Sequence, residues 1–203
     1  MLRKFLPDGV SWKRELAREI GYREAGSFLA RAQARYDELL GQAPRLDNRA
    51  LRNHFENRIL PAIAAYSVFL MDADKDTAVS RLDQLLEAGI GPERSMYRFW
   101  GRFPLFFDML RLMLKPMMQA QYTEGWEVEW LDLGRDVVGL NCHACFYLDV
   151  LTEYGFPELT QHFCRLDDLL AAEAASSIRF ERTQTLGRGG SLCDFRYMRV
   201  RRA

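Results

Sequence analysis

The spacing of the apolar residues changes at about residue 120 of this chain, and that change limits the folds available to it. Before about residue 120, large apolar side chains recur every three or four positions, as on one face of an α-helix. From Trp126 the period shortens to two, because Trp126, Val128 and Trp130 alternate with glutamates. Such alternation is typical of a strand that is buried on one side. The chain is therefore expected to combine a helical first part with a later part that contains a sheet.

Helices are expected through the first part, with breaks where glycine or proline falls. Residues 11–41 carry a helical pattern, and Gly21 and Gly26 suggest that it divides into two helices. A second helical stretch covers residues 49–71. Pro61 lies inside it, which predicts a kink or a change of helix at that point.

A third helix is expected over residues 78–88, with Asp76 or Thr77 as its N-cap. The segment 94–120 that follows is rich in aromatic residues and methionine. Such side chains commonly fill irregular cores, so we expect buried helices there. The alternative is that this segment forms one wall of an apolar ligand pocket.

Strands flank a pair of helices in the last part of the chain. The GRGG sequence of residues 187–190 is expected to form a hairpin turn, since a nucleotide-binding loop needs a helix after it. This order favours an antiparallel sheet with helices over one face, and the expected fold class is α+β. The helical part, residues 1–120, is expected to pack with the α+β part, residues 121–203, as one compact unit. Strands are expected near residues 126–130, 136–142, 178–186 and 192–201, and helices over residues 146–154 and 159–174, with Thr160 as a candidate cap.

Composition and charge argue against several classes of partner. Lys plus Arg and Asp plus Glu number 28 each, so no broad attraction to nucleic acid or to an acidic membrane is expected. The longest apolar run, residues 59–71, is too short to cross a bilayer, and the first residues lack the apolar core of a signal peptide. We therefore expect a cytoplasmic protein with reduced thiols and a small-molecule substrate, without a membrane or nucleic-acid partner. A homo-oligomer is compatible with the sequence.

The four cysteines fall between residues 142 and 193 and are the main candidates for chemistry. Cys142 and Cys145 have the spacing of a zinc-binding pair, but Cys164 and Cys193 stand apart, so no metal or other cofactor is expected. The C-x-x-C spacing also occurs in redox proteins, but no parallel βαβ unit precedes it here. Cys145 enters a helix, where exposed N–H groups and the helix dipole stabilise a thiolate. It is therefore the leading candidate nucleophile.

Alternation along the last strand divides its side chains into two sets. Cys193, Phe195 and Tyr197 share one face. Asp194 and Arg196 share the other face. Only one of these sets can face a given pocket.

The charged residues of the third strand allow two interpretations. Arg179, Glu181 and Arg182 can form cross-strand ion pairs, which we favour. In the alternative, one of the arginines binds a substrate carboxylate, which its planar fork suits.

At these residues the sequence resembles the family of L-2-amino-thiazoline-4-carboxylic acid hydrolases. Three elements carry the resemblance, and together they span roughly the last third of the chain. The first is Cys145 followed by GFPEL at residues 155–159. The second is FCRLDD, with Cys164 and Asp167. The third is FERTQTLGRGGSLCDFRY at residues 180–197, which ends in a Cys-Asp-Phe-Arg motif.

The resemblance implies hydrolytic opening of a cyclic amidine-like ring, which converts the aminothiazoline acid to N-carbamoyl-cysteine. Such a site needs an activated water or thiolate, a proton donor and a cation for the substrate carboxylate. Two residues of the C-x-x-C segment, Cys142 and His143, match no position of the family pattern. The alternative function is a non-catalytic small-molecule-binding or sensor module with an apolar pocket. The expected roles are Cys145 or Cys193 as nucleophile, His143 as base, Asp194 or Asp167 as partner of the amidinium-like group, Arg182 or Arg196 as carboxylate anchor, and Cys164 as a further substrate-binding residue.

Overall fold

The computed structural model describes residues 8–122 and 124–201, and its fold is α+β as expected. The chain forms two compact units, Met1–Ile90 and Gly91–Ala203. The boundary lies earlier than residue 120, so the aromatic and methionine-rich helices belong to the second unit, together with the sheet. None of the described helices is long and apolar enough to cross a membrane.

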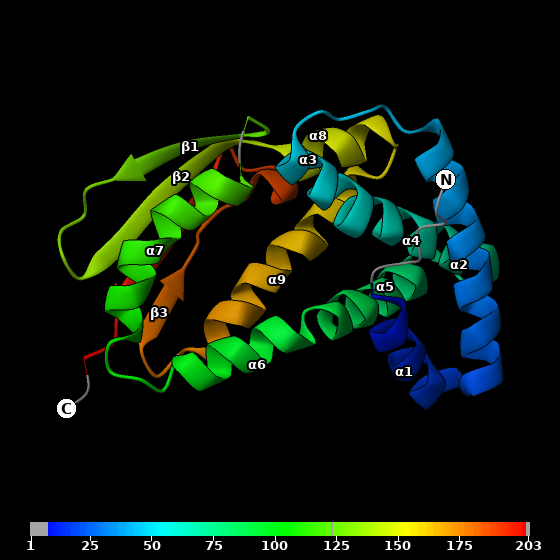
Figure 1. Cartoon of the computed structure of the whole chain (residues 1–203), viewed down its shortest axis with the longest axis horizontal. Helices are drawn as coiled ribbons and strands as arrows, with labels where there is room; N and C mark the ends of the chain where they lie inside the picture. Colours follow the sequence, from blue (N-terminus) through cyan, green and yellow to red (C-terminus); the bar gives the residue numbers. More distant parts are fainter. Residues whose placement is uncertain (1–7, 123, 202–203) are drawn as a thin grey trace. The chain divides into compact units, whose positions relative to one another are not determined.

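The described part of the first unit is entirely helical (Figure 1). The helix predicted over residues 11–41 breaks only at Gly21, whose φ of 85° lies in the left-handed region. Gly26 stays inside the second of the two helices. The unit comprises α1 (Gly9–Ile20), α2 (Tyr22–Gln42), α3 (Arg49–His54), the π-helical turn η1 (Phe55–Ile59), α4 (Leu60–Asp72) and α5 (Lys75–Gly89).

Pro61 marks a change of helix, as the sequence predicts. It lies in the first turn of α4, directly after the π-helical turn η1. Proline has no N–H to donate and its ring crowds the preceding turn, so a wider turn at this point avoids the clash. The N-cap predicted for α5 was wrong, because Asp74 rather than Asp76 or Thr77 caps it and accepts from the Thr77 N–H at 2.9 Å.

The second unit contains a four-stranded antiparallel sheet with the strand order β1-β2-β4-β3. Leu140 of β2 lies opposite Phe195 of β4, and Phe180 of β3 lies opposite Tyr197. The unit comprises α6 (Gly91–Trp100), α7 (Phe106–Gln121), β1 (Trp126–Leu131), β2 (Val137–Cys145), α8 (Phe146–Glu153), the 3-10 turn η2 (Pro157–Leu159), α9 (Thr160–Glu173), β3 (Ile178–Glu181), the 3-10 turn η3 (Leu186–Arg188) and β4 (Cys193–Arg199).

One face of this sheet packs against α7 and α9, which run beside it in Figure 1. Phe107 and Leu114 of α7 and Ala171 of α9 form a buried cluster with Leu140 and Ile178 of the sheet. Phe180, Phe195 and Tyr197 pack against the same cluster from the sheet. The alternation predicted for the last strand is therefore present, and its apolar set faces the helices.

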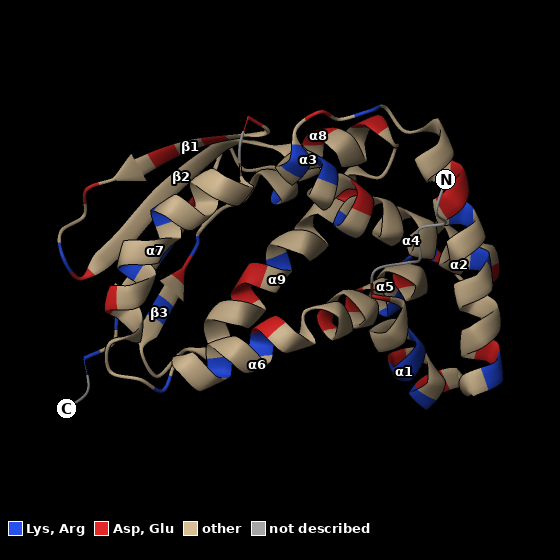
Figure 2. Cartoon of the chain, in the orientation of Figure 1, with Lys and Arg blue, Asp and Glu red and all other residues tan. Residues whose placement is uncertain are grey.

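The prediction that residues 94–120 form buried helices was wrong for much of the segment. α6 and α7 do form, but no residue of α6 is buried, and the buried residues of α7 are Phe106, Phe107, Leu110 and Leu114. A second set of apolar side chains in this segment stays exposed, and α7 is largely uncharged in Figure 2. Helical spacing predicts an apolar stripe but not the element that covers it. The exposed set comprises Met96, Phe99, Trp100, Phe103, Leu105, Met109, Leu112, Met113 and Met117.

Candidate active site

The four cysteines gather at one end of the sheet, as free thiols. Cys142 of β2 and Cys193 of β4 lie directly opposite each other, and both are buried. The pKa of Cys142 responds to Cys145, Cys193 and Cys164, which places all four thiols in one electrostatic neighbourhood. Residues that are 51 positions apart in the sequence thus form a single thiol cluster.

Cys145 is the N-cap of α8, as the sequence predicts, and its side chain is half-buried. Burial raises the pKa of its thiol, while the backbone N–H groups of Leu148 and Tyr147 act in the opposite direction. The expectation that the helix start holds a thiolate was therefore wrong, because desolvation outweighs the N–H groups. Cys145 is a protonated thiol at neutral pH and needs a base in order to react.

The other three thiols differ in how strongly their surroundings oppose ionisation. Burial raises the pKa of Cys142 and of Cys164 to about 12 in each case. Burial also raises the pKa of Cys193, but the Leu186 N–H and the Arg182 charge counteract it. The Leu186 N–H donates to Cys193 Sγ at 3.2 Å. A backbone hydrogen bond from Ala144 also lowers the pKa of Cys142, but burial still leaves that pKa at about 12, so Cys145 and Cys193 remain the better candidates for a thiolate.

Arg182 lies beside the thiol cluster, and its side chain is only 3% exposed. It donates to Asp167 at 3.0 Å, to Asp168 at 2.9 Å and to the carbonyl of Cys164 at 2.8 Å. The guanidinium also lies over the rings of Phe180 and Phe195, at 5.5 and 5.1 Å from their centres. These contacts fix Arg182 between α9 and β3, and a substrate carboxylate would have to replace one of its acidic partners.

Asp167 has a pKa suited to proton transfer near neutral pH. Burial raises the pKa of this carboxyl to about 6, and the Arg182 charge and hydrogen bond limit the rise. Its side chain is still 41% accessible, so it is reached by solvent although the surrounding protein desolvates it. The charge of Asp167 also raises the pKa of Cys193 and of Cys164, which places this carboxyl in the electrostatic neighbourhood of the thiols. A pKa of about 6 leaves Asp167 largely ionised at neutral pH, so it is the candidate base of this neighbourhood.

Three predicted site residues lie on the opposite face of the sheet, and two of them, Arg196 and His143, have partners on β2 or β1. Arg196 donates to the Leu140 and Phe195 carbonyls, at 2.8 and 2.9 Å, and to the Asn141 side chain at 2.8 Å. His143 lies 3.2 Å from Glu129, which also accepts from Asn141. The structure therefore does not bring Arg196 and His143 together with the side chains of Asp167 and Arg182.

Asp194 shapes the segment that follows Arg182. Its carboxylate accepts from the Thr183 N–H at 2.9 Å, the Thr183 hydroxyl at 2.7 Å and the Gln184 N–H at 2.8 Å. These bonds lower the pKa of Asp194, although burial opposes them. Asp194 therefore holds the segment that follows Arg182 to the start of β4, and its side chain lies on the face of the strand opposite that of Cys193.

The connection between β3 and β4 is more elaborate than the expected hairpin turn. It contains η3, which ends at Gly189 with a φ of 81°. Gly187 approaches the start of α9 so closely that a Cβ would lie 2.9 Å from the Thr160 methyl group and 3.1 Å from the Gln161 nitrogen. Thr160 is not the N-cap of α9, because η2 runs directly into that helix and Leu159 takes the cap position.

Asp168 and Tyr197 are neighbours of the site that sequence reasoning did not single out. Asp168 stands next to Asp167 in FCRLDD, so the acidic pair was the available signal. Burial and the Asp167 charge raise the pKa of Tyr197 well above its ordinary value, so its phenol is a hydrogen-bond donor.

Within residues 8–122 and 124–201, no three His, Cys, Asp or Glu side chains are arranged to hold a metal ion.

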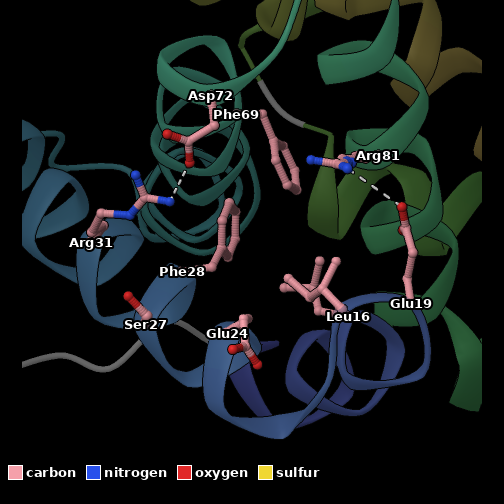
Figure 3. A pocket seen from close by; sticks show the side chains of 10 residues that line it. Leu16, Glu19, Glu24, Ser27, Phe28, Arg31, Phe69, Asp72 and Arg81 are labelled. Carbon is pink, nitrogen blue, oxygen red and sulfur yellow. Dashed lines mark hydrogen bonds and ion pairs between the residues drawn. The ribbon is translucent and has the colours of Figure 1, made fainter.

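A hollow of about 300 Å³ lies in the first unit and contains none of the predicted site residues (Figure 3). Phe28 and Phe69 stack in it, with ring centres 4.3 Å apart. An ion pair joins Arg31 to Asp72, and Arg81 lies 3.5 Å from Glu19. The charged side chains in this hollow are thus largely paired with one another, and no cysteine or histidine lines it.

Comparison with known proteins gives one match. A family model described as L-2-amino-thiazoline-4-carboxylic acid hydrolase matches residues 52–197, well over half of the chain. The matched region includes all four cysteines, Asp167, Arg182 and Asp194. No curated protein and no solved structure matches the chain.

Proposed function

Since this chain belongs to the L-2-amino-thiazoline-4-carboxylic acid hydrolase family, we propose that it hydrolyses a small cyclic amidine. The proposed substrate is L-2-amino-thiazoline-4-carboxylate or a close relative, and the product is N-carbamoyl-L-cysteine or its counterpart. The observation that carries this proposal is the position of Asp167, with a pKa of about 6, beside a cluster of protonated thiols.

Cys193 or Cys145 supplies the nucleophile, because backbone N–H groups support a thiolate at both positions. Asp167 accepts the proton as the sulfur attacks, since a carboxylate with a pKa of about 6 is largely ionised at neutral pH. Burial keeps Cys142 and Cys164, each with a pKa of about 12, protonated and unreactive.

The reaction proceeds through a covalent intermediate. The cysteine sulfur bonds to carbon 2 of the ring, the bond from that carbon to the ring sulfur breaks, and the ring sulfur leaves as a thiolate and takes a proton. Water then attacks the same carbon, the enzyme sulfur leaves, and the carbon becomes the carbonyl of the carbamoyl group. The sum is the addition of one water to the substrate, with both nitrogens retained.

The remaining residues of the site hold the reacting groups in place. Arg182 fixes Asp167 through a bond of 3.0 Å and counteracts the rise of its pKa. Asp194 fixes the segment between Arg182 and Cys193 through Thr183 and Gln184. His143 and Arg196, which lie on the other face of the sheet, are not assigned to the chemistry.

The test is turnover of L-2-amino-thiazoline-4-carboxylate by the purified protein in ¹⁸O-labelled water. We expect N-carbamoyl-L-cysteine with one ¹⁸O in the carbamoyl group, as measured by mass spectrometry. Either Cys193→Ala or Cys145→Ala should reduce kcat by at least about 10³-fold, because it removes the attacking atom.

Cys142→Ala is the matched control, because it also removes a buried thiol from the cluster, and it should retain turnover. Absence of turnover by the folded wild-type protein would overturn the proposed function. Full turnover in both Cys193→Ala and Cys145→Ala would leave a hydrolase but exclude the covalent route, with water as the direct nucleophile.

A further inference from the structure

Two buried cysteines face each other across the strand pair β2–β4. Cys142 and Cys193 are direct register partners in this antiparallel pair, and each residue is only 5% exposed. Directly opposite residues of such a pair point to the same face of the sheet, and their Cα atoms are about 4.5 or 5.5 Å apart. Disulfides span Cα separations of about 4.4–6.8 Å. The backbone therefore already holds these two cysteines at a separation that a disulfide can bridge.

The C-x-x-C spacing does not offer the same possibility. Cys142 and Cys145 both lie in β2, and the backbone is still extended at Cys145. Three residues of an extended strand cover roughly 10 Å. Cysteines whose Cα atoms are more than about 7 Å apart cannot be bridged without movement of the backbone. Of these two partners, the sheet therefore favours the thiol opposite Cys142 over its neighbour in the sequence.

The two thiols of this pair differ in their readiness to react. Burial raises the pKa of both, but at Cys193 the Leu186 N–H and the Arg182 charge act in the opposite direction. The Leu186 N–H lies 3.2 Å from the Cys193 sulfur. The pKa of Cys142 reaches about 12. Because oxidants react with the thiolate form, Cys193 is the member of the pair that is expected to react first.

We propose that Cys142 is a resolving thiol, which converts peroxide oxidation of Cys193 into a reversible disulfide between the two strands. In the first step, the Cys193 thiol reacts with hydrogen peroxide and gives a sulfenic acid and one water. In the second step, the Cys142 sulfur attacks the Cys193 sulfur, the S–O bond breaks, and hydroxide leaves with the Cys142 proton as a second water. The two thiols together lose two electrons and two protons, and the peroxide is reduced to two waters.

The disulfide regulates the reaction proposed above, and this consequence rests on the proposed function. Where Cys193 supplies the attacking sulfur, its bond to Cys142 stops turnover until a thiol reductant breaks that bond. A site that admits the substrate ring to Cys193 also admits hydrogen peroxide, which is smaller. The disulfide protects Cys193 as well, because a sulfenic acid that is not resolved is oxidised further to a sulfinic acid, which thiols do not reduce.

The test is mass spectrometry of the purified protein after treatment with hydrogen peroxide, alkylation of the remaining thiols and digestion with trypsin. Trypsin releases Cys193 in the peptide 189–196 and Cys142 in the peptide 136–165, which also contains the other two cysteines. We expect a disulfide to join these two peptides, and fragmentation of the pair should place the bond at Cys142. Treatment with dithiothreitol before digestion should abolish the link and restore turnover.

Substitution of Cys142 tests its role directly. In Cys142→Ala, and in Cys142→Ser, which nearly keeps the side-chain volume, peroxide should give no disulfide. The fraction of Cys193 that is converted to a sulfinic acid should rise at least about 10-fold over wild-type protein, because no thiol resolves the sulfenic acid. Cys164→Ala is the matched control, since it removes another thiol of the cluster with a pKa of about 12 and should still form the disulfide.

Three results would overturn this inference. They are a disulfide of Cys193 that persists in both Cys142 variants, wild-type Cys193 that becomes a sulfinic acid without forming a disulfide, and wild-type Cys193 that stays reduced under peroxide. Mass spectrometry reports the oxidation state of each thiol directly, so these results can be read even in a protein that does not hydrolyse the aminothiazoline acid. Failure of the proposed function is therefore distinguishable from failure of this inference.

Discussion

At the scale of single residues, Asp167 sets the expected pH dependence of turnover. Its carboxylate form accepts the thiol proton, so kcat should rise with pH through about 6 and then level off. Asp167→Asn should remove this rise and lower kcat by about 10²-fold, as measured in pH–rate profiles of both proteins. Asp132→Asn, in the loop between β1 and β2, is the control and should keep the wild-type profile. An inflection near pH 6 that persists in Asp167→Asn would assign that titration to another group.

The same variant has a readout that does not depend on catalysis. Burial raises the pKa of Asp167 from 3.8 to about 6, so the folded protein binds this proton more tightly than the unfolded chain does. The contribution of Asp167 to stability is therefore most favourable below about pH 4 and declines as the pH rises to about 6. Urea denaturation across this range should show a decline that is smaller in Asp167→Asn.

The sequence predicts the composition of the two faces of the last strand, but not which face is used. Alternation separates Cys193 and Tyr197 from Asp194 and Arg196, and the structure has this arrangement. The helices that cover the first set come from distant parts of the chain, so local spacing contains no information about them. For that reason the sequence could offer Arg196 as a carboxylate anchor although it lies on the face opposite that of the cysteines.

The pKa values of the thiols also depend on packing that the local sequence does not reveal. The helix start at Cys145 is visible in the sequence, and the N–H groups that favour a thiolate follow from it. The burial that outweighs them depends on the packing of the whole unit. For Asp167 the sequence gives no local signal at all, because nothing in FCRLDD indicates that its pKa is raised.

At the scale of elements, the contact between η3 and the start of α9 fixes the segment that leads to Cys193. Gly187 allows this contact, because a Cβ there would meet both the Thr160 methyl group and the Gln161 backbone nitrogen. Gly187→Ala should therefore lower the free energy of unfolding by about 1–3 kcal/mol, as measured by urea denaturation.

Gly26→Ala is the matched control for this substitution. Gly26 lies inside α2, and a Cβ there would have nothing within 4 Å. Alanine should therefore stabilise the helix by about 0.5–1 kcal/mol. If both substitutions stabilise the protein equally, the close contact of η3 with α9 does not constrain the fold.

The elements that the sequence predicts well are those whose ends have a local chemical cause. Gly21 ends α1 through its positive φ, and Pro61 follows a change from π-helix to α-helix. The connection from β3 to β4 was harder to predict, because Asp194 holds its first residues and the start of α9 packs against η3. Glycine content alone could not distinguish it from a simple hairpin turn.

At the scale of the whole molecule, the family match and the two units divide the chain differently. The match begins at residue 52 and ends at residue 197, so it includes α4 and α5 of the first unit as well as nearly all of the second. α1 and α2 lie outside it. The part of the chain that identifies the family is therefore larger than the unit that contains the thiol cluster.

The exposed apolar side chains of residues 96–117 predict self-association of the protein. Nine large apolar side chains there are between 38% and 75% exposed. If a fully exposed side chain presents roughly 200 Å² of surface, these nine together expose on the order of 900 Å². A typical stable interface needs about 800 Å² from each partner, and the largest apolar patch on a monomer is usually smaller. The apolar area in this segment is therefore sufficient for a homodimer, which the sequence analysis left open.

Sedimentation velocity over a range of protein concentrations measures this self-association directly. Leu112 is 75% exposed and Leu105 is 73% exposed, so glutamate at either position removes no buried contact and places a charge in any interface formed by this segment. Leu112→Glu and Leu105→Glu should each weaken dimerisation by at least about 10-fold, because an unpaired charge is costly to desolvate. Val10→Glu is the control, since Val10 is 77% exposed on α1, in the other unit, and its substitution should leave the dimer intact. A wild-type protein that stays monomeric at every concentration would contradict the prediction, and a dimer that resists both leucine substitutions would place the interface elsewhere.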